Sequence, residues 1–434
     1  MARIKLAYIG GGSTRAPGTV ASFVAQGENF AGSELVLIDL DEERLKVVET
    51  IGRKLARARG LDLKITATTD RRDGLRDCSA VLTSYRPGGF EARHLDEKIP
   101  LKHGVIGQET QGPGGFFMAL RTIPVMKKII ADMEAVCPNA RLFNYTNPVN
   151  IVSEAVTHHT ATPTISFCEQ PILDTRRYAE FADLDPNKLA TSFIGLNHGS
   201  WSVRPLYDGR EFIPLLQQAY EHALRTGKVP RADLRMIELA CFMEALPNDY
   251  FRYYYFKEEI LVELQAKPTT RAQDIMARVE DYWIHYREQA RREVPVLDPA
   301  RSRGGIHELE LAIDALDAIY NDRREWLYIN VPNQGALQDF PDDLVVELRG
   351  YLDRRGAVPC GEYARLPRPV RGLVQMLGEY QALAAEAAWS GTRRDAMRAL
   401  ASHPLVLSLH KAEAIYDELS AALHDYLPAR LLRN

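Results

Sequence analysis

The stretch IKLAYIGGGSTR, residues 4–15, decides the fold predicted for this chain. Its first half, Ile4–Ile9, is apolar and predicts a buried strand, and a helix is expected over Pro17–Ala25. Between them lies a turn of small residues, namely Gly10, Gly11, Gly12 and Ser13. Such a turn lets the backbone approach a pyrophosphate, whose charge the helix N-terminus favours. The stretch therefore predicts a dinucleotide site, with a tight turn that binds no ligand as the alternative.

The acidic residue expected in such a site is also present. Asp39 ends the next predicted strand, Glu34–Leu40, where its carboxylate can accept hydrogen bonds from the adenosine ribose. A carboxylate at this position would repel a 2′-phosphate, so the pattern favours NAD over NADP. The usual third glycine of the motif is missing, because Arg15 stands in its place.

Strands and helices continue to alternate over the first 196 residues. This pattern predicts βαβ units, a parallel sheet and an α/β fold of the Rossmann type. The further strands are expected at Lys64–Thr68, Ala80–Tyr85, Ala140–Tyr145 and Pro163–Cys168. The further helices are expected at Asp41–Gly60, Phe116–Val136 and Asn150–Thr157, with a long glycine-rich loop before the second of them.

Helices dominate after about residue 196. They are predicted over Pro214–Arg225, Leu234–Glu244, Thr270–Arg291, Ile306–Tyr320, Val370–Trp389 and Ala401–Leu427, the last one broken near Pro404. Two short strands, Trp326–Val331 and Val345–Leu348, lie between them. We therefore expect an NAD-binding domain over residues 1–196, followed over residues 197–434 by an α+β domain for substrate binding, catalysis and oligomerisation.

The composition narrows the class of protein. The chain has 434 residues, 46% hydrophobic and 26% charged, as in an ordinary globular protein. Its formal net charge of −4 predicts no binding to nucleic acid or anionic membrane, and no apolar run approaches the ~20 residues that span a bilayer. Five cysteines without a CxxC pair, and an N-terminus without a signal-peptide core, predict a cytoplasmic protein.

Cys168 and His198 are the candidate metal ligands. Cys168 ends a predicted strand, and His198 follows in the segment GLNHGSW. A thiolate with an imidazole suits a divalent ion such as manganese, iron, cobalt or nickel, and two protein ligands leave positions open for water or substrate. A buried inert cysteine and a structural histidine are the alternative. The other cysteines are expected to be structural, namely Cys78, Cys137, Cys241 and Cys360.

Four further segments are rich in glycine or polar residues. They are YRPGGFEARHLDEKIP at 85–100, GVIGQETQGPGG at 104–115, NYTNPVN at 144–150 and LPNDYFRYYYF at 246–256. With GGGS, IDLD, GLNH and the late NQGALQDFPDD, in this order, they make the chain resemble glycoside hydrolase family 4 over essentially its whole length. The resemblance implies a fold related to lactate and malate dehydrogenases, and a glycosidase that needs NAD and a divalent metal, most often Mn²⁺.

The resemblance also implies which residues bind the cofactors. NAD would be held by Gly10, Gly11, Gly12, Ser13, Asp39 and Asn147, the last of which would also touch the sugar. The metal would be held by Cys168 and His198, with Glu109 beside it. Such an enzyme would act on a small glycoside as a homodimer or homotetramer.

The substrate and the base follow from the same resemblance. Arg86 and Arg93 match an arginine pair found in members that act on 6-phosphorylated sugars, and Arg303 is a further phosphate candidate. Tyr250 would be the base that removes the C2 proton after NAD-dependent oxidation at C3, before the aglycone is eliminated. A helix would place Tyr250, Tyr253 and Tyr254 on one face, so spacing alone does not select among them.

Two departures from the family pattern leave the anomeric preference and the aglycone open. The residue after the metal cysteine is usually Asn in the 6-phospho-β-glucosidase branch and Asp in the 6-phospho-α-glucosidase branch, but here it is Glu169. Glu169 would either protonate the leaving oxygen or make an ionic contact at the metal rim. The segment after RSRGG is also unusual, with Ile306, His307 and Glu308.

Three other functions fit parts of the pattern. A family member that acts on unphosphorylated glycosides would share most of these motifs. A plain NAD-dependent dehydrogenase of a hydroxy acid or sugar would need the glycine turn but not Cys168, and it would produce NADH. A nucleotide-binding regulatory protein would not need the set Cys168, His198, Asn147 and Tyr250.

Overall fold

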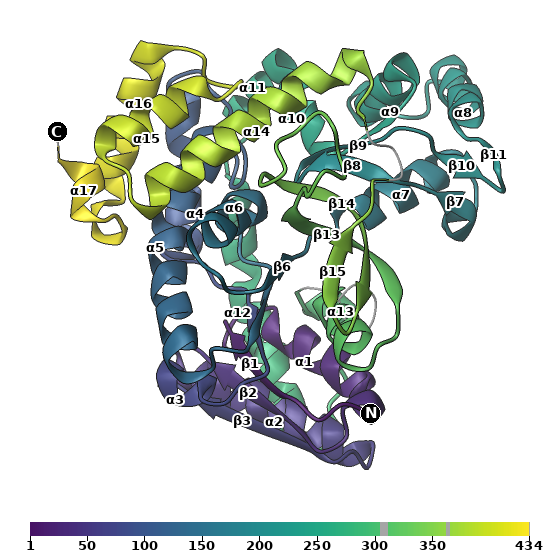
Figure 1. Cartoon of the computed structure of the whole chain (residues 1–434). Coiled ribbons are helices and arrows are strands. Elements are labelled where there is room, and N and C mark those ends of the chain that lie inside the picture. The colour runs from purple at the N-terminus through teal and green to yellow at the C-terminus, as the bar shows by residue number, and fades with distance from the viewer. Residues whose placement is uncertain (304–310, 362–364, 434) are drawn as a thin grey trace.

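Six parallel strands carry the glycine turn (Figure 1). In the computed structural model, which describes residues 1–303, 311–361 and 365–433, β1 (Lys5–Ile9) lies between β2 (Ser33–Ile38) and β4 (Ala80–Thr83). The sheet is extended on either side by β3 (Leu63–Thr68), β5 (Arg141–Asn144) and β6 (Thr164–Ser166). The order β3-β2-β1-β4-β5-β6 is that of a doubly wound dinucleotide-binding sheet, so the predicted α/β fold is confirmed.

Each face of this sheet carries its own hydrophobic core, because neighbouring strand residues point to opposite sides. Ala7 and Ile9 pack under α5 (Gly112–Val136) and α6 (Val149–His159). Leu6 and Tyr8 pack on the other face, which is covered by α1 (Ala16–Ala25), α2 (Glu42–Ala58) and α13 (Leu311–Tyr320). Fully burying one large apolar side chain contributes ~1.5–3 kcal/mol, so the two cores fix the strand ends on which the site is built.

Strands from the second half of the chain continue the same sheet in antiparallel fashion. β13 (Glu325–Pro332) pairs with β6, and β14 (Val345–Asp353) connects β13 to β8 (Phe193–Leu196). The edge is completed by β9 (Gly199–Ser202) and β12 (Leu246–Pro247), and β15 (Gly356–Pro359) pairs with β14. The sheet is therefore continuous across residue 196, and the division into domains at that point stays a prediction.

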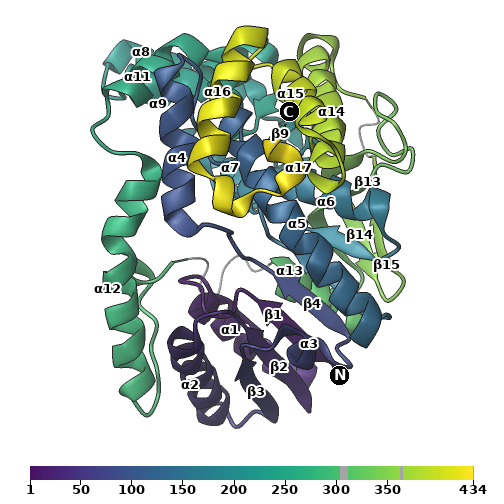
Figure 2. The same cartoon turned by 90° about the vertical axis from the view of Figure 1, so that its left-hand side faces the viewer.

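Most helices of the second half lie in the upper part of the molecule as drawn in Figure 1, whereas α13 lies lower. Figure 2 shows α12 (Arg271–Arg291) standing beside the sheet, where it packs along both α2 and α4 (Gly89–Lys102). A capping box at Thr270 starts α12, as its predicted beginning suggests. The other long helices are α8 (Ile213–Thr226), α9 (Arg231–Met243), α11 (Lys257–Ala266), α14 (Arg368–Trp389), α15 (Arg393–Ser402) and α16 (Leu409–Ala422).

Several short elements connect the larger ones. The short helices are α3 (Arg71–Leu75), α10 (Arg252–Tyr255) and α17 (Ala429–Leu432), and the short strands are β7 (Leu189–Ala190), β10 (Leu206–Tyr207) and β11 (Arg210–Glu211). Single 3₁₀ turns occur at Gly27–Phe30, Pro186–Lys188, Asp249–Phe251, Pro299–Arg301 and His424–Tyr426. Within the described residues, no helix is both long enough and apolar enough to cross a membrane.

Three predictions of secondary structure need correction. The glycine-rich loop expected before Phe116 contains a helix, α4 (Gly89–Lys102), and α5 already begins at Gly112. The apolar period is hidden because α4 buries charged side chains, among them Arg93, Asp96 and Glu97. A helix with a polar buried face has no apolar stripe for a sequence pattern to detect.

The predicted break near Pro404 is confirmed, because residues 403–408 separate α15 from α16, but the predicted extent Ala401–Leu427 is wrong, because α15 begins before it and α16 ends at Ala422. Ser408 caps the start of α16 by accepting a hydrogen bond from the backbone of Lys411. An unpredicted helix, α7 (Gln170–Phe181), follows Glu169 directly. Of the predicted helix Ile306–Tyr320, residues 306–310 lie outside the described residues, and the rest forms α13.

Candidate active site

Several of the polar residues selected from the sequence lie at the carboxyl ends of the parallel strands. Gly10 follows β1, Asp39 follows β2, and Cys168 lies two residues beyond β6. All three strands are parallel members of one sheet, so their carboxyl ends face the same crevice. Such a crevice is where open α/β sheets bind their ligands.

The glycine turn packs closely against the neighbouring strand ends. Gly10 has a φ of +103°, and a Cβ added to it would lie 2.1 Å from the carbonyl oxygen of Ser84, so no side chain fits. The backbone N–H of Gly12 donates to Asp39 Oδ2 at 2.9 Å, which ties the turn to the predicted ribose acid. Ser13 Oγ is buried without a hydrogen-bond partner in the described part of the chain. These features fit a dinucleotide, whose phosphate would satisfy such a donor.

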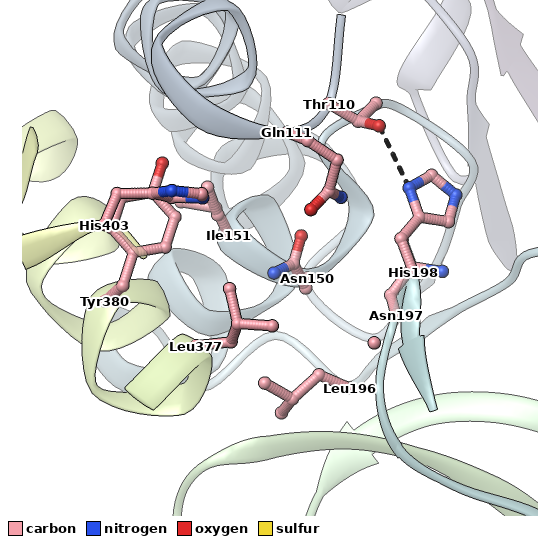
Figure 3. A pocket seen from close by; sticks show the side chains of 11 residues that line it. Thr110, Gln111, Asn150, Ile151, Leu196, Asn197, His198, Leu377, Tyr380 and His403 are labelled. Atoms are coloured by element: carbon pink, nitrogen blue, oxygen red, sulfur yellow. Dashed lines mark hydrogen bonds between the residues drawn. The ribbon is translucent and has the colours of Figure 1, made fainter. Parts of the chain in front are cut away.

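Cys168, which follows β6, lies next to His198, which is in the turn between β8 and β9. Cys168 Sγ lies 3.4 Å from His198 Nε2, while His198 Nδ1 lies 3.0 Å from Thr110 Oγ1, a contact drawn in Figure 3. Burial lowers the pKa of His198 to about 3, so the imidazole is neutral, as a metal ligand must be. Burial raises the pKa of the Cys168 thiol to about 12, and a bound cation would oppose that effect.

As candidate metal ligands, these two residues would form an open rather than a closed site. Among residues 1–303, 311–361 and 365–433, no group of three or more His, Cys, Asp or Glu side chains is arranged to hold a metal ion. A sulfur and an imidazole nitrogen suit Mn²⁺, iron, cobalt or nickel, and the remaining positions would be left to water or substrate.

Tyr250 is the member of the tyrosine run that reaches this pair. Its ring stacks on the His198 imidazole, with centroids 3.7 Å apart and planes 6° from parallel. Burial, followed by the Glu109 charge, raises the pKa of Tyr250 well above its ordinary value. The phenol therefore needs a nearby cation before it can act as a base at neutral pH.

The other three tyrosines of the run lie elsewhere. Tyr253 accepts a hydrogen bond from Arg252 at 3.0 Å, Tyr254 bonds to Gln111, and Tyr255 packs edge-on against Trp201. The first tyrosine belongs to the 3₁₀ turn Asp249–Phe251 and the others to α10, so they do not form one uniform face.

An arginine cluster lies beside Glu109. Arg86 and Arg93 both contact Glu109 Oε2, at 2.7 and 2.9 Å. Burial alone would raise the pKa of Glu109, but Arg86, Arg93 and Arg303 outweigh it and lower the value to about 2. Burial, followed by the neighbouring Arg86 charge, lowers the pKa of Arg303 to about 10. Three guanidinium groups around one carboxylate suit an anion such as a phosphate.

Glu169 and Asn147 occupy the rim of the same crevice. Glu169 forms an ion pair with Arg15 at 2.9 Å, so it bridges the glycine turn and the end of β6. Burial raises the pKa of Glu169, against the opposing effect of Arg15. Asn147 precedes α6, and its side-chain oxygen accepts a hydrogen bond from Val149 N at 3.3 Å. Ile306, His307 and Glu308 lie outside the described residues.

Three residues that shape the site were not selected from the sequence. Thr110 touches His198, Arg15 pairs with Glu169, and Glu347 holds the turn that carries His198. Thr110 belongs to the quoted segment GQETQGPGG, and Arg15 was noted only as a missing glycine. Glu347 lies in a strand nearly 150 residues from that turn, so no local pattern points to it.

The parallel sheet, the glycine turn and the Cys168–His198–Tyr250 arrangement together define an enzyme of the Rossmann-type α/β class. The model described as family 4 glycosyl hydrolase matches residues 5–184, and the model of its C-terminal domain matches residues 193–406. The chain belongs to glycosyl hydrolase family 4, as the sequence motifs predict.

Comparisons with individual proteins support the same family assignment. The 6-phospho-beta-glucosidase of Escherichia coli (strain K12) is 34% identical over 98% of this chain and 96% of its own length. The solved 6-phospho-beta glucosidase from Thermotoga maritima with manganese, NAD⁺ and glucose-6-phosphate has a TM-score of 0.82 and 25% identity, covering 98% of this chain and 99% of that chain. Malate dehydrogenase from Plasmodium falciparum, at 13% identity and a TM-score of 0.54 over 89% of this chain and all of its own, shares the fold alone.

Proposed function

We propose that this chain hydrolyses the O-glycosidic bond of 6-phosphoglucosides with the help of NAD and Mn²⁺. The observation that carries the proposal is the stacking of Tyr250 on His198, 3.7 Å apart, beside the Cys168 thiol. This arrangement places a candidate base against a candidate metal site, which a simple dehydrogenase does not need. Family membership and the ligands named for the Thermotoga maritima structure support the same function.

Each group of site residues has its own role in the proposed reaction. Gly10–Ser13 and Asp39 would hold NAD, Asn147 would touch both the nicotinamide and the sugar, and Cys168 and His198 would hold the metal. When bound, NAD supplies a hydride acceptor at C3 of the sugar, and the divalent ion supplies Lewis-acid stabilisation of the neighbouring sugar oxygens. Tyr250 removes the C2 proton, which is acidic because it lies next to a carbonyl group, and the aglycone leaves C1 by elimination. Water then adds to C1 of the unsaturated ketone, and return of the hydride to C3 completes the hydrolysis.

The arginine cluster recognises the 6-phosphate in this proposal. Arg86 and Arg93 share Glu109, whereas Arg303 has a depressed pKa and lies over the ring of Phe90, 4.7 Å from its centroid. Guanidinium groups bind phosphate through paired hydrogen bonds, so the cluster suits a phosphorylated sugar better than a plain one.

Glu169 is the residue in which two roles compete. Its ion pair with Arg15 at 2.9 Å favours a fixed ionic contact at the rim over a mobile general acid. Glu169→Gln separates the two roles. If Glu169 protonates the leaving oxygen, the variant loses rate on substrates with poor leaving groups and keeps it on p-nitrophenyl substrates. A rim contact would affect both substrate types alike.

The test of the function is a panel of p-nitrophenyl glucosides. It compares α with β anomers and 6-phosphorylated with plain sugars, each with and without NAD and Mn²⁺. Release of p-nitrophenol only from phosphorylated substrates, and only with both additives, supports the proposal. Cleavage by protein stripped of NAD would refute the redox route.

The same assay separates the alternatives. A dehydrogenase of a hydroxy acid or sugar would accumulate NADH, which absorbs at 340 nm, whereas the proposed cycle returns the hydride and shows no net change. Equal rates on plain and phosphorylated glucosides would favour a family member that acts on unphosphorylated sugars.

We also propose a cytoplasmic homo-oligomer, and the free state of all five cysteines supports the cytoplasm.

A further inference from the structure

We propose that Thr110 is a positioning residue that fixes the tautomer of His198 and so turns its Nε2 lone pair toward Cys168. The inference rests on the metal site of the proposed function. It concerns a residue that touches neither the metal nor the sugar in that proposal, and it follows from which groups donate and which accept hydrogen bonds around one hydroxyl.

The side-chain oxygen of Gln108 sets the direction of the first hydrogen bond. Gln108 Oε1 lies 2.6 Å from Thr110 N and 2.8 Å from Gln111 N, and backbone N–H groups can only donate. The amide must therefore present its oxygen, not its NH₂ group, to this loop. The same oxygen lies 3.0 Å from Thr110 Oγ1, where it can accept the hydroxyl proton of Thr110 as a third hydrogen bond, because an amide oxygen cannot donate.

The second hydrogen bond follows from the first. A hydroxyl has one proton, and we assign the proton of Thr110 to the contact with Gln108, which leaves only lone pairs of Oγ1 facing His198 Nδ1 at 3.0 Å. Nδ1 must then carry the imidazole proton. In the neutral ring this leaves Nε2 unprotonated, and Nε2 is the atom that lies 3.4 Å from Cys168 Sγ. The hydrogen bonds from Thr110 to Gln108 and from His198 to Thr110 thus leave a lone pair on Nε2, where a metal ligand is needed.

The loop that carries Thr110 is held rigidly by close packing. A Cβ added to Gly115, in the first turn of α5, would lie 2.3 Å from the carbonyl carbon of Thr110, so only glycine lets the helix approach. Thr110 itself is only 7% exposed. Figure 3 shows the dashed Thr110–His198 contact on the wall of a cavity about the size of one water molecule. A rigid, buried hydroxyl can select one tautomer, whereas a mobile one cannot.

The experiment compares Thr110→Val with Thr110→Ser. Valine keeps the shape of threonine and removes the hydroxyl, whereas serine keeps the hydroxyl. Thr122→Val is the matched control, because Thr122 is a buried threonine of α5 whose hydroxyl has no hydrogen-bond partner among the described residues. Histidine ¹⁵N NMR of the metal-free protein at about pH 8, where imidazole is neutral, reads the tautomer directly. Mn²⁺ titration followed by electron paramagnetic resonance reads the affinity.

The proposal predicts that wild type, Thr110→Ser and Thr122→Val hold the His198 proton on Nδ1. Thr110→Val should mix the tautomers and weaken Mn²⁺ binding about 10–100-fold, with NAD binding unchanged. Gln108→Leu should also mix them, because it frees the Thr110 proton to point at His198. A wild-type protein with the proton on Nε2, or a Thr110→Val variant with unchanged tautomer and affinity, would overturn the inference.

The same measurements distinguish a failure of the proposed glycosidase function from a failure of the role proposed for Thr110. A wild-type protein that binds Mn²⁺ with the predicted His198 tautomer, yet cleaves no 6-phosphoglucoside, would contradict the function and support the role of Thr110. Cleavage by a protein whose His198 holds its proton on Nε2 would do the reverse.

Discussion

The Asn197 side chain donates a hydrogen bond to Glu347 at 2.9 Å, one residue before the proposed metal ligand His198. On the other side of His198, Ser200 Oγ donates to the second oxygen of the same carboxylate at 2.8 Å. His198 itself has a φ of +60°, a left-handed conformation that costs a non-glycine residue about 1–2 kcal/mol. The buried Glu347 therefore clamps both ends of a turn that would not hold this shape unaided.

Removing this clamp should loosen the metal site. Glu347→Ala removes the acceptor of three buried donors, on Asn197, Ser200 and Asn330, so we expect a loss of about 2–4 kcal/mol in the free energy of unfolding and weaker Mn²⁺ binding. Glu347→Gln keeps one acceptor and should cost about 1 kcal/mol. Urea unfolding and Mn²⁺ titration measure the two effects. An Ala variant with wild-type stability would show that the turn is held by other contacts.

Cys168→Ser tests the thiol ligand. The hydroxyl is a poorer ligand than a thiolate, so we expect Mn²⁺ affinity to fall at least about 10-fold and most activity to be lost, while the fold persists. Oxidation of Cys168 should inactivate the enzyme in the same way. Cys241→Ser, at a half-buried cysteine on α9, is the matched control. Wild-type turnover of Cys168→Ser at low Mn²⁺ would contradict the assignment.

Tyr250→Phe tests the base. The variant should bind NAD and metal but no longer exchange the C2 proton of the substrate with solvent deuterium, which mass spectrometry or NMR detects. Tyr254→Phe removes a hydroxyl that bonds to Gln111 instead, so exchange should stay measurable while stability or substrate affinity falls. If deuterium enters C2 at a near wild-type rate in Tyr250→Phe, another residue is the base, and Tyr253 is the next to test.

Arg303→Gln tests phosphate recognition at an arginine that forms no ion pair with another described residue. The side chain contacts Thr14 at 3.4 Å, is repelled by Arg86 and is attracted by Glu109, so its loss should change the free energy of unfolding little. KM for a 6-phosphoglucoside should rise at least about 10-fold, since one charge-assisted hydrogen bond to phosphate is worth about 1.5–3 kcal/mol. Replacing Arg93 instead would confuse binding with folding, because Arg93 neutralises the nearly buried Glu97.

Asp174 should make stability depend on pH. Burial, followed by the nearby Asp249 charge, raises the pKa of Asp174 from 3.8 to about 8. The folded state therefore keeps a proton that the unfolded chain releases above about pH 4. The resulting stability is complete below that pH and is lost as the pH rises through about 8, by up to about 1.4 kcal/mol per pH unit.

Asp174→Asn should flatten this pH dependence. The carboxylate accepts hydrogen bonds from Gln170 at 2.9 Å and from the backbone of Asp249 at 3.1 Å, and an amide keeps the size and one acceptor. Urea unfolding at several pH values between about 5 and 9 measures the slope, with the exposed Asp281→Asn as control. An unchanged slope in Asp174→Asn would show that Asp174 is ionised throughout.

The sequence predicts the strands that carry the site better than the contacts within it. Local patterns suffice for Ile4–Ile9 and its glycine turn, because an apolar run and small residues act over a few positions. The helix α4 escaped prediction because Arg93, Asp96 and Glu97 are buried in pairs that only tertiary structure creates. The same reason hides Glu347, whose partners lie in distant segments. The order of motifs led to the family, which no single motif could do.

The placement of β13 and β14 between β6 and β8 has a consequence for engineering. If the chain were divided between residues 203 and 324, each fragment would expose an unpaired strand edge, and such edges drive aggregation. Neither fragment is therefore a useful module by itself. Together they are complementary, since the gap left by one is filled by the strands of the other. A reporter assembled from two such pieces would recover its sheet and its Cys168–His198 pair in the same event.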